Sequence, residues 1–207
     1  MRLAKTRLLC VLIFAVLIFV VASPSTSVSS GHSARVAAPA VTCTARYDAA
    51  VVELRAKRAR ACLEKLDALA RRCVTPDDAV VRRKAFFLQA EVLLLSGEWD
   101  ACAHAARLAQ GTRHSSRAEL LIANAASHKK THAGIASDVA AGRNARATKS
   151  ANSLLKKAPR AVELYVLRAR AAVASHHCGR SRFDVVEALR LDPTNVDARL
   201  VLSEALR

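Results

Sequence analysis

Histidine and cysteine side chains, which commonly bind transition metals, form two short groups in this sequence. Residues 176–178 read His-His-Cys, but consecutive residues of a helix point in different directions and do not converge on one ion. His128 and His132 are four residues apart and would share one face of a helix. Lys129 and Lys130 lie between them, a composition typical of a solvated helix C-terminus, which favours cations. We therefore predict a polar turn and a solvated helix end, with no metal and no cofactor.

Nucleophilic catalysis is not indicated either. Ser115 and Ser116 follow His114, but the sequence shows no acidic partner that would complete a catalytic triad with them. None of the nucleophile-elbow motifs occurs. The protein is therefore predicted not to be an enzyme, and no catalytic residue is assigned.

The cysteines bear on the cellular compartment. Cys10 lies in the apolar N-terminal segment, which leaves five in the rest of the chain: Cys43, Cys62, Cys73, Cys102 and Cys178. Five is an odd number, so at least one thiol stays free or pairs outside the chain. Cys62 and Cys73 would lie roughly 16 Å apart on one unbroken helix, too far for a disulfide. Most of these cysteines are expected to pack as small apolar side chains between helices, and their pairing stays open.

The first 22 residues resemble a secretory signal peptide. Arg2, Lys5 and Arg7 form a basic start, and residues 8–22 are an unbroken apolar run. That run is short for a transmembrane helix, which needs about 20 apolar residues. We predict a cleaved signal and a place in the secretory pathway, most simply the lumen of the endoplasmic reticulum. A retained signal anchor, which would hold the protein on a membrane, is the alternative.

Composition favours helices packed closely together. The chain is 52% hydrophobic and 4% aromatic, with 6 Gly and 5 Pro among 207 residues, so a core must be built from Leu, Val and Ala. The net charge of +16 attracts acidic partners in general. Between residues 53 and 72, however, basic residues alternate with Glu53, Glu64 and Asp67, as on a solvated helix face. No nucleic-acid motif is visible, and no nucleic-acid partner is predicted.

Helix-ending and helix-starting residues define a hairpin after Thr75. Thr75 can cap a helix that begins with Pro76 and carries apolar residues at helical spacing as far as Leu95. Gly97 allows a tight turn, Trp99 follows it, and residues 101–110 form the returning helix. Residues 185–198 hold a second such junction. Residues 191–193 read Leu-Asp-Pro, where a helix ends, and Asn195 can cap the next helix.

These two segments resemble tetratricopeptide (TPR) repeats, in which 34-residue helical hairpins stack on one another. In the first hairpin, Phe86, Ala90 and Leu93 occupy the family's fourth, eighth and eleventh positions. In the last hairpin, Tyr165 occupies the fourth position and Ala169 the eighth, whereas His176 replaces the turn glycine. The resemblance implies an all-α fold, a short α-solenoid of TPR-like helical hairpins with a single C-terminal helix.

The predicted organisation is a signal peptide or anchor at 1–22, a disordered lead-in at 23–42 and a helical domain at 43–207. Repeats at about 75–111, 115–158 and 162–195 precede a closing helix at 196–206, and 45–74 is one long helix or a broken pair. From Gly97 to His176 is 79 residues (176 minus 97), more than two repeats of about 34. We assign the excess to an enlarged polar loop at 132–144.

The resemblance implies that the protein binds other proteins. It is similar to the repeat region of lumenal co-chaperones that carry a J domain, although the His-Pro-Asp tripeptide of that domain is absent from this sequence. The protein is then a repeat-only relative, or a fragment of a longer chain. Its predicted partners are unfolded clients and lumenal chaperones, with a membrane only if the N-terminal segment is retained.

A binding groove follows from the same resemblance. TPR proteins that grip acidic chaperone tails carry Lys and Asn at the fifth and ninth positions of their first helices. Here only Arg170 is basic at those places, so that mode of binding is not predicted. Apolar residues there fit exposed segments of unfolded clients better. The predicted client groove consists of Phe87, Glu91, Leu121, Val166 and Arg170.

Overall fold

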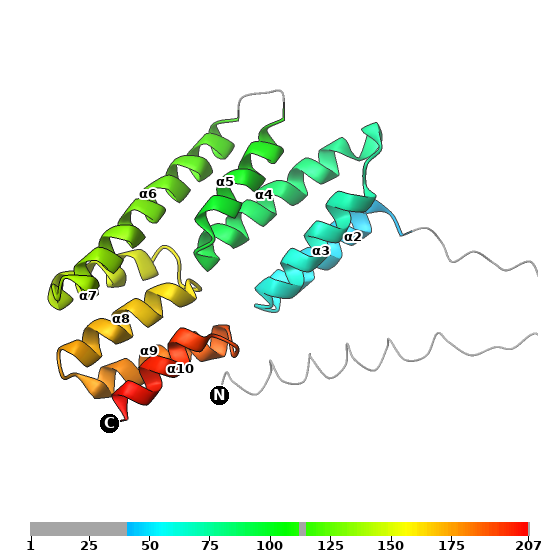
Figure 1. Ribbon diagram of the computed structural model, residues 1–207. Coiled ribbons are helices and arrows are strands. Elements are labelled where there is room, and N and C mark those ends of the chain that lie inside the picture. Colours follow the sequence, from blue (N-terminus) through cyan, green and yellow to red (C-terminus); the bar gives the residue numbers. More distant parts are fainter. Residues whose placement is uncertain (1–40, 112–114, 207) are drawn as a thin grey trace, which may run out of the picture. The chain divides into compact units, whose positions relative to one another are not determined.

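The structure, a computed structural model, describes residues 41–111 and 115–206 (Figure 1). The predicted signal segment at 1–22 and nearly all of the lead-in at 23–42 lie outside these residues. The described residues form helices and no strand: α2 (Cys43–Arg55), α3 (Ala59–Arg72), the short 3-10 helix η1 (Pro76–Asp78), α4 (Ala79–Ser96), α5 (Trp99–Gln110), α6 (Ser116–Ala140), α7 (Asn144–Leu155), α8 (Val162–Ala174), α9 (Cys178–Leu191) and α10 (Val196–Ala205). The predicted all-α fold is confirmed.

The helices pair into antiparallel hairpins in chain order. The pairs are α2 with α3, α4 with α5, α6 with α7 and α8 with α9, and α10 packs alone on α8 and α9 (Figure 1). Each first helix also contacts the first helix of the next pair, from α2 to α10. We call the surface that α2, α4, α6, α8 and α10 share the first-helix face. This arrangement is the predicted α-solenoid with a single C-terminal helix, and 45–74 proves to be a pair of helices.

All four hairpins turn in the same way. The turn residues Lys57, Gly97, Gly142 and His176 have φ angles of 61°, 86°, 71° and 58°. In each case the backbone N–H of the following residue donates a hydrogen bond of 2.8–3.0 Å to the carbonyl five residues earlier, as Glu98 does to Leu93. This bond closes the C-terminus of the first helix. His176 therefore adopts the same left-handed turn as the glycines, although a side chain makes that conformation costly.

The predicted enlarged loop at 132–144 is wrong. Helix α6 continues through most of it to Ala140 and is 25 residues long, whereas α8 has 13. The helix continues because Ile135 and Asp138 are buried on one side of it, while Gly134 has open space around it. The turn falls at Gly142 instead. The excess length of the middle hairpin is thus added helix.

Buried apolar residues group into three cores. The largest lies among α4, α5, α6, α7 and α8 and includes Trp99, Cys102 and Leu164. Burial raises the pKa of the Cys102 thiol to about 11, so this cysteine acts as a small apolar side chain. Smaller cores lie among α2, α3 and α4 and among α8, α9 and α10.

A disulfide joins Cys43, at the start of α2, to Cys73, just after α3. The Cα atoms are 5.9 Å apart and the cysteines are 30 positions apart in the chain. Closing a loop of that length removes unfolded-state entropy worth roughly 3.6 kcal/mol at 25 °C. Cys62 and Cys102 are free and buried, whereas Cys178 is free and exposed. The bridge therefore fastens the first hairpin at its open end.

None of the described helices is both long enough and apolar enough to cross a bilayer.

Candidate protein-binding surfaces

Two of the predicted groove residues lie together on the first-helix face. Phe87 and Glu91 of α4 line a small depression of about 100 Å³ with side chains of α2 and α6. Its lining is Tyr47, Lys84, Phe87, Leu88, Glu91 and Arg117, which we call the first-helix depression. Arg117 forms an ion pair with Glu91, and its guanidinium carbon lies 5.2 Å from the centroid of the Phe87 ring. The depression therefore combines two aromatic rings with charges of both signs.

Leu121 and Val166 are not available in a groove. Their exposed fractions are 6% and 5%. Leu121 belongs to the largest core because both α4 and α5 pack against α6. Val166 belongs to the core beneath α10 and packs with Val201. Their assignment to an exposed groove is therefore wrong, since neighbouring helices cover those sides of α6 and α8.

Arg170 lies apart from the depression. Its guanidinium donates a hydrogen bond of 2.6 Å to Asp197 of α10. The depression, in contrast, is lined by residues of α2, α4 and α6. Arg170 thus connects two first helices, as the Glu91–Arg117 ion pair does for α4 and α6. The structure does not unite the five predicted groove residues in one place.

The residues at the fourth, eighth and eleventh repeat positions divide into two groups. Leu93 and Ala169 are buried, whereas Phe86 and Tyr165 are half-buried. The Tyr165 hydroxyl donates a 3.0 Å hydrogen bond to the Pro159 carbonyl. Its ring also lies beneath a guanidinium, 5.6 Å from the Cζ atom of Arg168.

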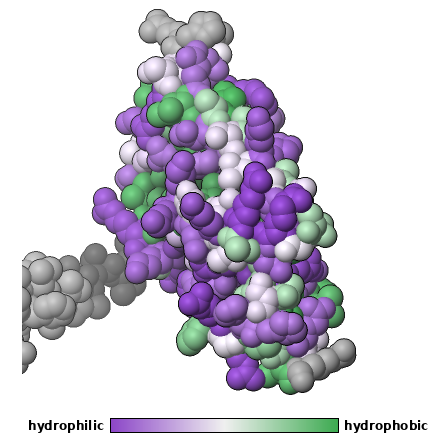
Figure 2. Space-filling view, turned by 90° about the vertical axis from the view of Figure 1, so that its left-hand side faces the viewer, coloured by the Kyte–Doolittle hydropathy of each residue, from purple (hydrophilic) through white to green (hydrophobic). Residues whose placement is uncertain are grey.

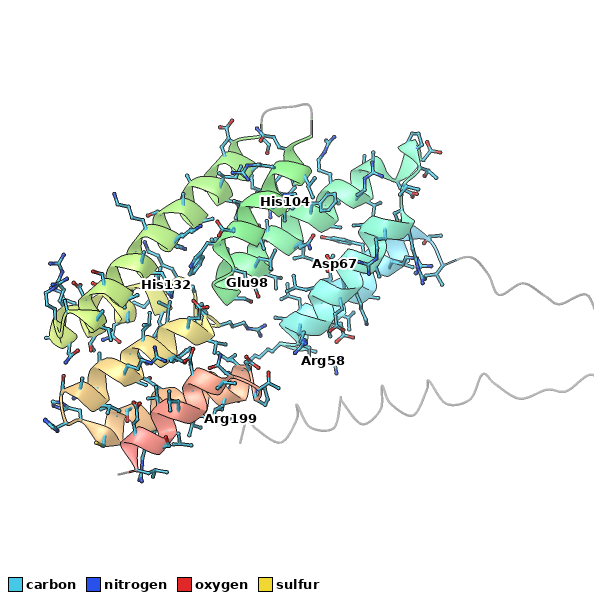
Figure 3. All side chains as sticks on the ribbon, in the orientation of Figure 1. Arg58, Asp67, Glu98, His104, His132 and Arg199 are labelled. Atoms are coloured by element: carbon cyan, nitrogen blue, oxygen red, sulfur yellow. A yellow bond between two sulfur atoms is a disulfide. The ribbon has the colours of Figure 1, made fainter. Side chains whose placement is uncertain are left out.

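The two histidines of α6 do not lie at a solvated helix end, because the helix continues beyond them. His128 is buried, and its ring meets the Trp99 ring edge to face with centroids 5.3 Å apart. Burial, helped by the positive charge of Lys157, lowers the pKa of His128. His132 points toward α8 (Figure 3), where its Nε2 lies 3.1 Å from the Glu163 carboxylate. This contact lowers the pKa of Glu163.

Residues 176–178 lie at the turn between α8 and α9. His176 forms the turn and His177 precedes α9, whose first residue is Cys178. Within the described part of the chain, the ligand atoms of Cys43, Cys73 and Asp78 come close enough to share an ion. Both cysteines, however, are consumed by the disulfide.

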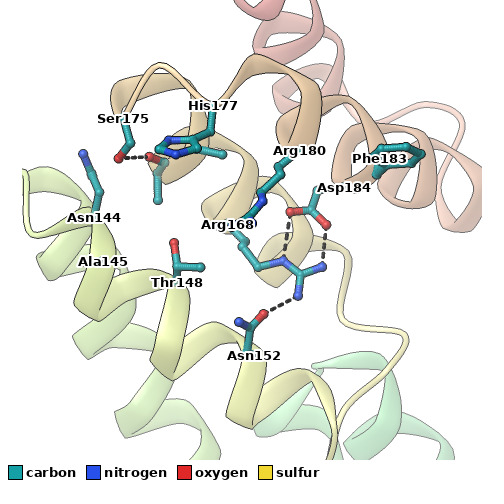
Figure 4. Close-up of a pocket in the computed structure, with 12 residues that line it drawn as sticks. Asn144, Ala145, Thr148, Asn152, Arg168, Ser175, His177, Arg180, Phe183 and Asp184 are labelled. Atoms are coloured by element: carbon teal, nitrogen blue, oxygen red, sulfur yellow. Dashed lines mark hydrogen bonds and ion pairs between the residues drawn. The ribbon is translucent and has the colours of Figure 1, made fainter.

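A larger cavity, not predicted from the sequence, lies among α7, α8 and α9 (Figure 4). Its volume is about 490 Å³. The polar side chains that line it are Asn144, Thr148, Asn152, Arg168, Ser175, His177, Arg180 and Asp184, and Phe183 lines it as well. We call this space the α7–α9 cavity. It is large enough to hold one or two side chains of a peptide.

One wall of the α7–α9 cavity is a fixed network of hydrogen bonds. Arg168 donates to both carboxylate oxygens of Asp184, through Nε at 2.8 Å and through Nη2. Its Nη1 donates to Asn152 Oδ1 at 2.5 Å. Asp184 is buried, so its charge is neutralised within the wall. No pattern in the sequence predicts this pair, because its members are 16 positions apart on different helices.

The surface around these features is largely polar. In the view of Figure 2, hydrophilic residues predominate and apolar ones form small separate groups. Exposed apolar residues include Phe183, of which 80% is accessible, and Leu120 of α6 at 61%. Charged side chains are spread over all helices (Figure 3). This surface therefore favours binding at local depressions over binding on a broad apolar patch.

Similarity to known proteins is found among solved structures and not among sequences. No protein-family model matches the sequence, and no curated protein matches it either. Among solved structures, the TPR domain of P58(IPK) is similar, with a TM-score of 0.67 and 17% sequence identity over 81% of this chain. The chain spans 46% of the length of that structure. The TPR2AB domain of yeast Sti1, solved in complex with pHSP90, aligns with a TM-score of 0.38 and 15% identity, over 79% of this chain and 70% of that one.

The described residues therefore have the fold of a TPR domain, as the repeat-like motifs predict.

Proposed function

We propose that the protein is a protein-binding module that captures peptide segments on its first-helix face. The observation that carries the proposal is the first-helix depression, in which Phe87 and Tyr47 are partly exposed beside Lys84 and Arg117. Aromatic residues next to Arg are enriched where protein surfaces bind strongly. Stacked repeats bind their partners on an extended surface built from equivalent helices, which supports the first-helix face as the place of binding. Binding, and not catalysis, is the proposed activity.

The proposed ligands are unfolded segments of client proteins. Burial of Leu121 and Val166 removes two apolar residues from the predicted groove. The apolar side chains that line the depression are Tyr47, Phe87 and Leu88, so client binding should depend strongly on Phe87. A role as a co-chaperone without a J domain, acting with lumenal chaperones, agrees with this chemistry.

The proposed compartment is the secretory pathway, with the lumen of the endoplasmic reticulum as the site of action. The Cys43–Cys73 disulfide supports it, because such bonds persist in oxidising compartments. The second candidate function is a membrane-anchored scaffold, held by an uncleaved segment at 1–22. N-terminal sequencing of the protein from cells separates the two. A start near Ser23 supports the lumenal module, and an intact Met1 supports the anchor.

The binding test uses a permanently unfolded probe, a fluorescein-labelled protein that has been reduced and carboxymethylated. We expect Phe87→Ala to weaken its binding roughly tenfold, equivalent to ~1.4 kcal/mol. Leu108→Ala is the matched control, because Leu108 is an exposed apolar residue of α5 outside both the first-helix depression and the α7–α9 cavity. Circular dichroism must show both variants folded at the assay temperature, since Phe87 also touches the largest core. Equal affinities for the two variants would refute the proposed surface.

A further inference from the structure

We propose that the α7–α9 cavity is a second binding site, and that its ligand is an acidic peptide segment. The cavity is separate from the first-helix depression, because its lining comes from α7, α8 and α9, whereas the depression is lined by α2, α4 and α6. The inference is therefore independent of client capture at Phe87. The charges that line the cavity, and those among them already neutralised by a partner, decide which ligand it can accept.

The charge balance of the cavity is positive. Its charged lining consists of Arg168, Arg180 and Asp184. Asp184 is the carboxylate of the lining, and Arg168 already holds both of its oxygens. Arg180 forms no ion pair with a described residue, and its side chain extends into the cavity (Figure 4). An incoming carboxylate thus meets an unpaired guanidinium and no free negative charge.

Hydrogen-bond donors remain for that carboxylate. A guanidinium has five N–H donors, and Arg168 uses three of them on Asp184 and Asn152. The bidentate pair with Asp184 also fixes the orientation of Arg168 before a ligand arrives, which lowers the entropy cost of binding. Arg180 offers a second guanidinium, whose fork matches the two oxygens of a carboxylate.

The backbone adds to the positive potential. Helices α7 and α9 both begin at the cavity, with Asn144 and His177 among its lining residues. Neither helix has a side-chain hydrogen bond at its N-cap. Their first-turn N–H groups and helix dipoles therefore favour an anion on this side. These termini support the site, while the unpaired Arg180 and the walled cavity define it.

The remaining lining fits a peptide and not an isolated ion. Thr148, Asn152 and Ser175 line the same space and supply groups that bond peptide N–H and C=O. Phe183, which is 80% accessible, lies at the cavity and offers a ring for an apolar side chain of the ligand. A volume of about 490 Å³ is also much larger than a single phosphate requires.

The test measures binding of a fluorescein-labelled, terminally blocked peptide of four aspartates to the full-length protein, by fluorescence anisotropy at low salt. A peptide of four asparagines is the uncharged comparison. We expect Arg180→Ala to weaken binding of the acidic peptide at least tenfold. Arg182→Ala is the matched control, since Arg182 is an exposed arginine of α9 outside the cavity lining, and it should change affinity less than twofold.

Three results would overturn the proposal. Equal losses in the Arg180 and Arg182 variants would mean that the peptide responds to the net charge of the chain. Binding of the asparagine peptide as tight as that of the aspartate peptide would remove the charge argument. Full displacement by low-millimolar inorganic phosphate would make the cavity a general anion site. Phe87→Ala should leave this affinity unchanged, so failure here is distinguishable from failure of client capture.

Discussion

Replacing Gly97 by alanine tests how the hairpins are held together, and Gly142 provides the comparison. Both glycines have left-handed φ angles, 86° and 71°, which cost an alanine about 1–2 kcal/mol. Alanine regains about 0.5–1 kcal/mol because the unfolded chain loses freedom. Gly142→Ala should therefore destabilise the protein by only about 0.5–1 kcal/mol, since nothing lies within 4 Å of a Cβ placed there.

Gly97 has a second requirement. A Cβ at this position would lie 2.7 Å from the Cβ of Ala161 and 3.2 Å from its Cα. Ala161 cannot move away easily, because the residue before it, Arg160, donates a 3.0 Å hydrogen bond from its backbone N–H to the Leu95 carbonyl of α4. Overpacking of this kind costs typically 1–3 kcal/mol. Added to the turn cost, it predicts a loss of about 1.5–4 kcal/mol for Gly97→Ala.

Urea unfolding followed by helical circular dichroism measures both variants. The free energies of unfolding should differ by more than about 1 kcal/mol, with similar slopes. Adding Ala161→Gly to Gly97→Ala should recover part of the loss, which a double-mutant cycle isolates. If the two glycine variants lose the same stability within about 0.5 kcal/mol, the contact between the α4–α5 turn and Ala161 does not constrain the fold.

Three further predictions concern the turn, the disulfide and pH. His176→Gly should raise the free energy of unfolding by about 0.5–1 kcal/mol, because glycine adopts the left-handed turn without the cost paid by a side chain; urea unfolding checks it, and a loss would show that the His176 side chain stabilises the turn. Replacing both Cys43 and Cys73 by alanine should cost roughly 3–4 kcal/mol; a change below about 1 kcal/mol would mean that the disulfide hardly constrains the unfolded chain. The lowered pKa of His128 means that the unfolded state binds more protons, so stability should decline as pH falls from about 7 through the unfolded histidine pKa of about 6.5. His128→Gln should reduce that decline. If the free energy of unfolding of the variant falls between about pH 7 and 5.5, above the range of Glu163, as steeply as that of the unaltered protein, the role assigned to His128 is contradicted.

Local signals in the sequence were sufficient where one helix ends and the next begins. Asn195 caps α10 as predicted, its side chain accepting a 2.8 Å hydrogen bond from the Ala198 N–H. Thr75 was expected to cap in the same way, but its hydroxyl donates to Asp78 instead and η1 precedes α4. Capping depends on a few neighbouring residues, so errors stay small. The turn at Lys57 had no such signal, since lysine is not a residue that favours a left-handed turn.

Longer-range packing explains the larger errors. Residues 132–144 are polar and contain two glycines, which reads as a loop when the segment is taken alone. Burial of Ile135 and Asp138 on one side of α6 stabilises helix there instead. In the same way, the burial of Leu121 depends on two other helices and that of Val166 on α10. A pattern counted along one helix contains no information about how many neighbours cover it.

The α7–α9 cavity shows why a binding surface is harder to predict than a fold. The repeat motifs consist of residues at which helices touch, such as Gly97, Trp99 and Ala169. The cavity forms where α7 and α9 leave part of α8 uncovered, and its charges come from positions that no packing rule fixes. Arg168 is neutralised by Asp184 whereas Arg180 is not, a distinction that only the paired helices reveal. Function in such a stack should therefore be sought among unpaired side chains in its gaps, and Arg180 is the residue at which this reasoning can be tested.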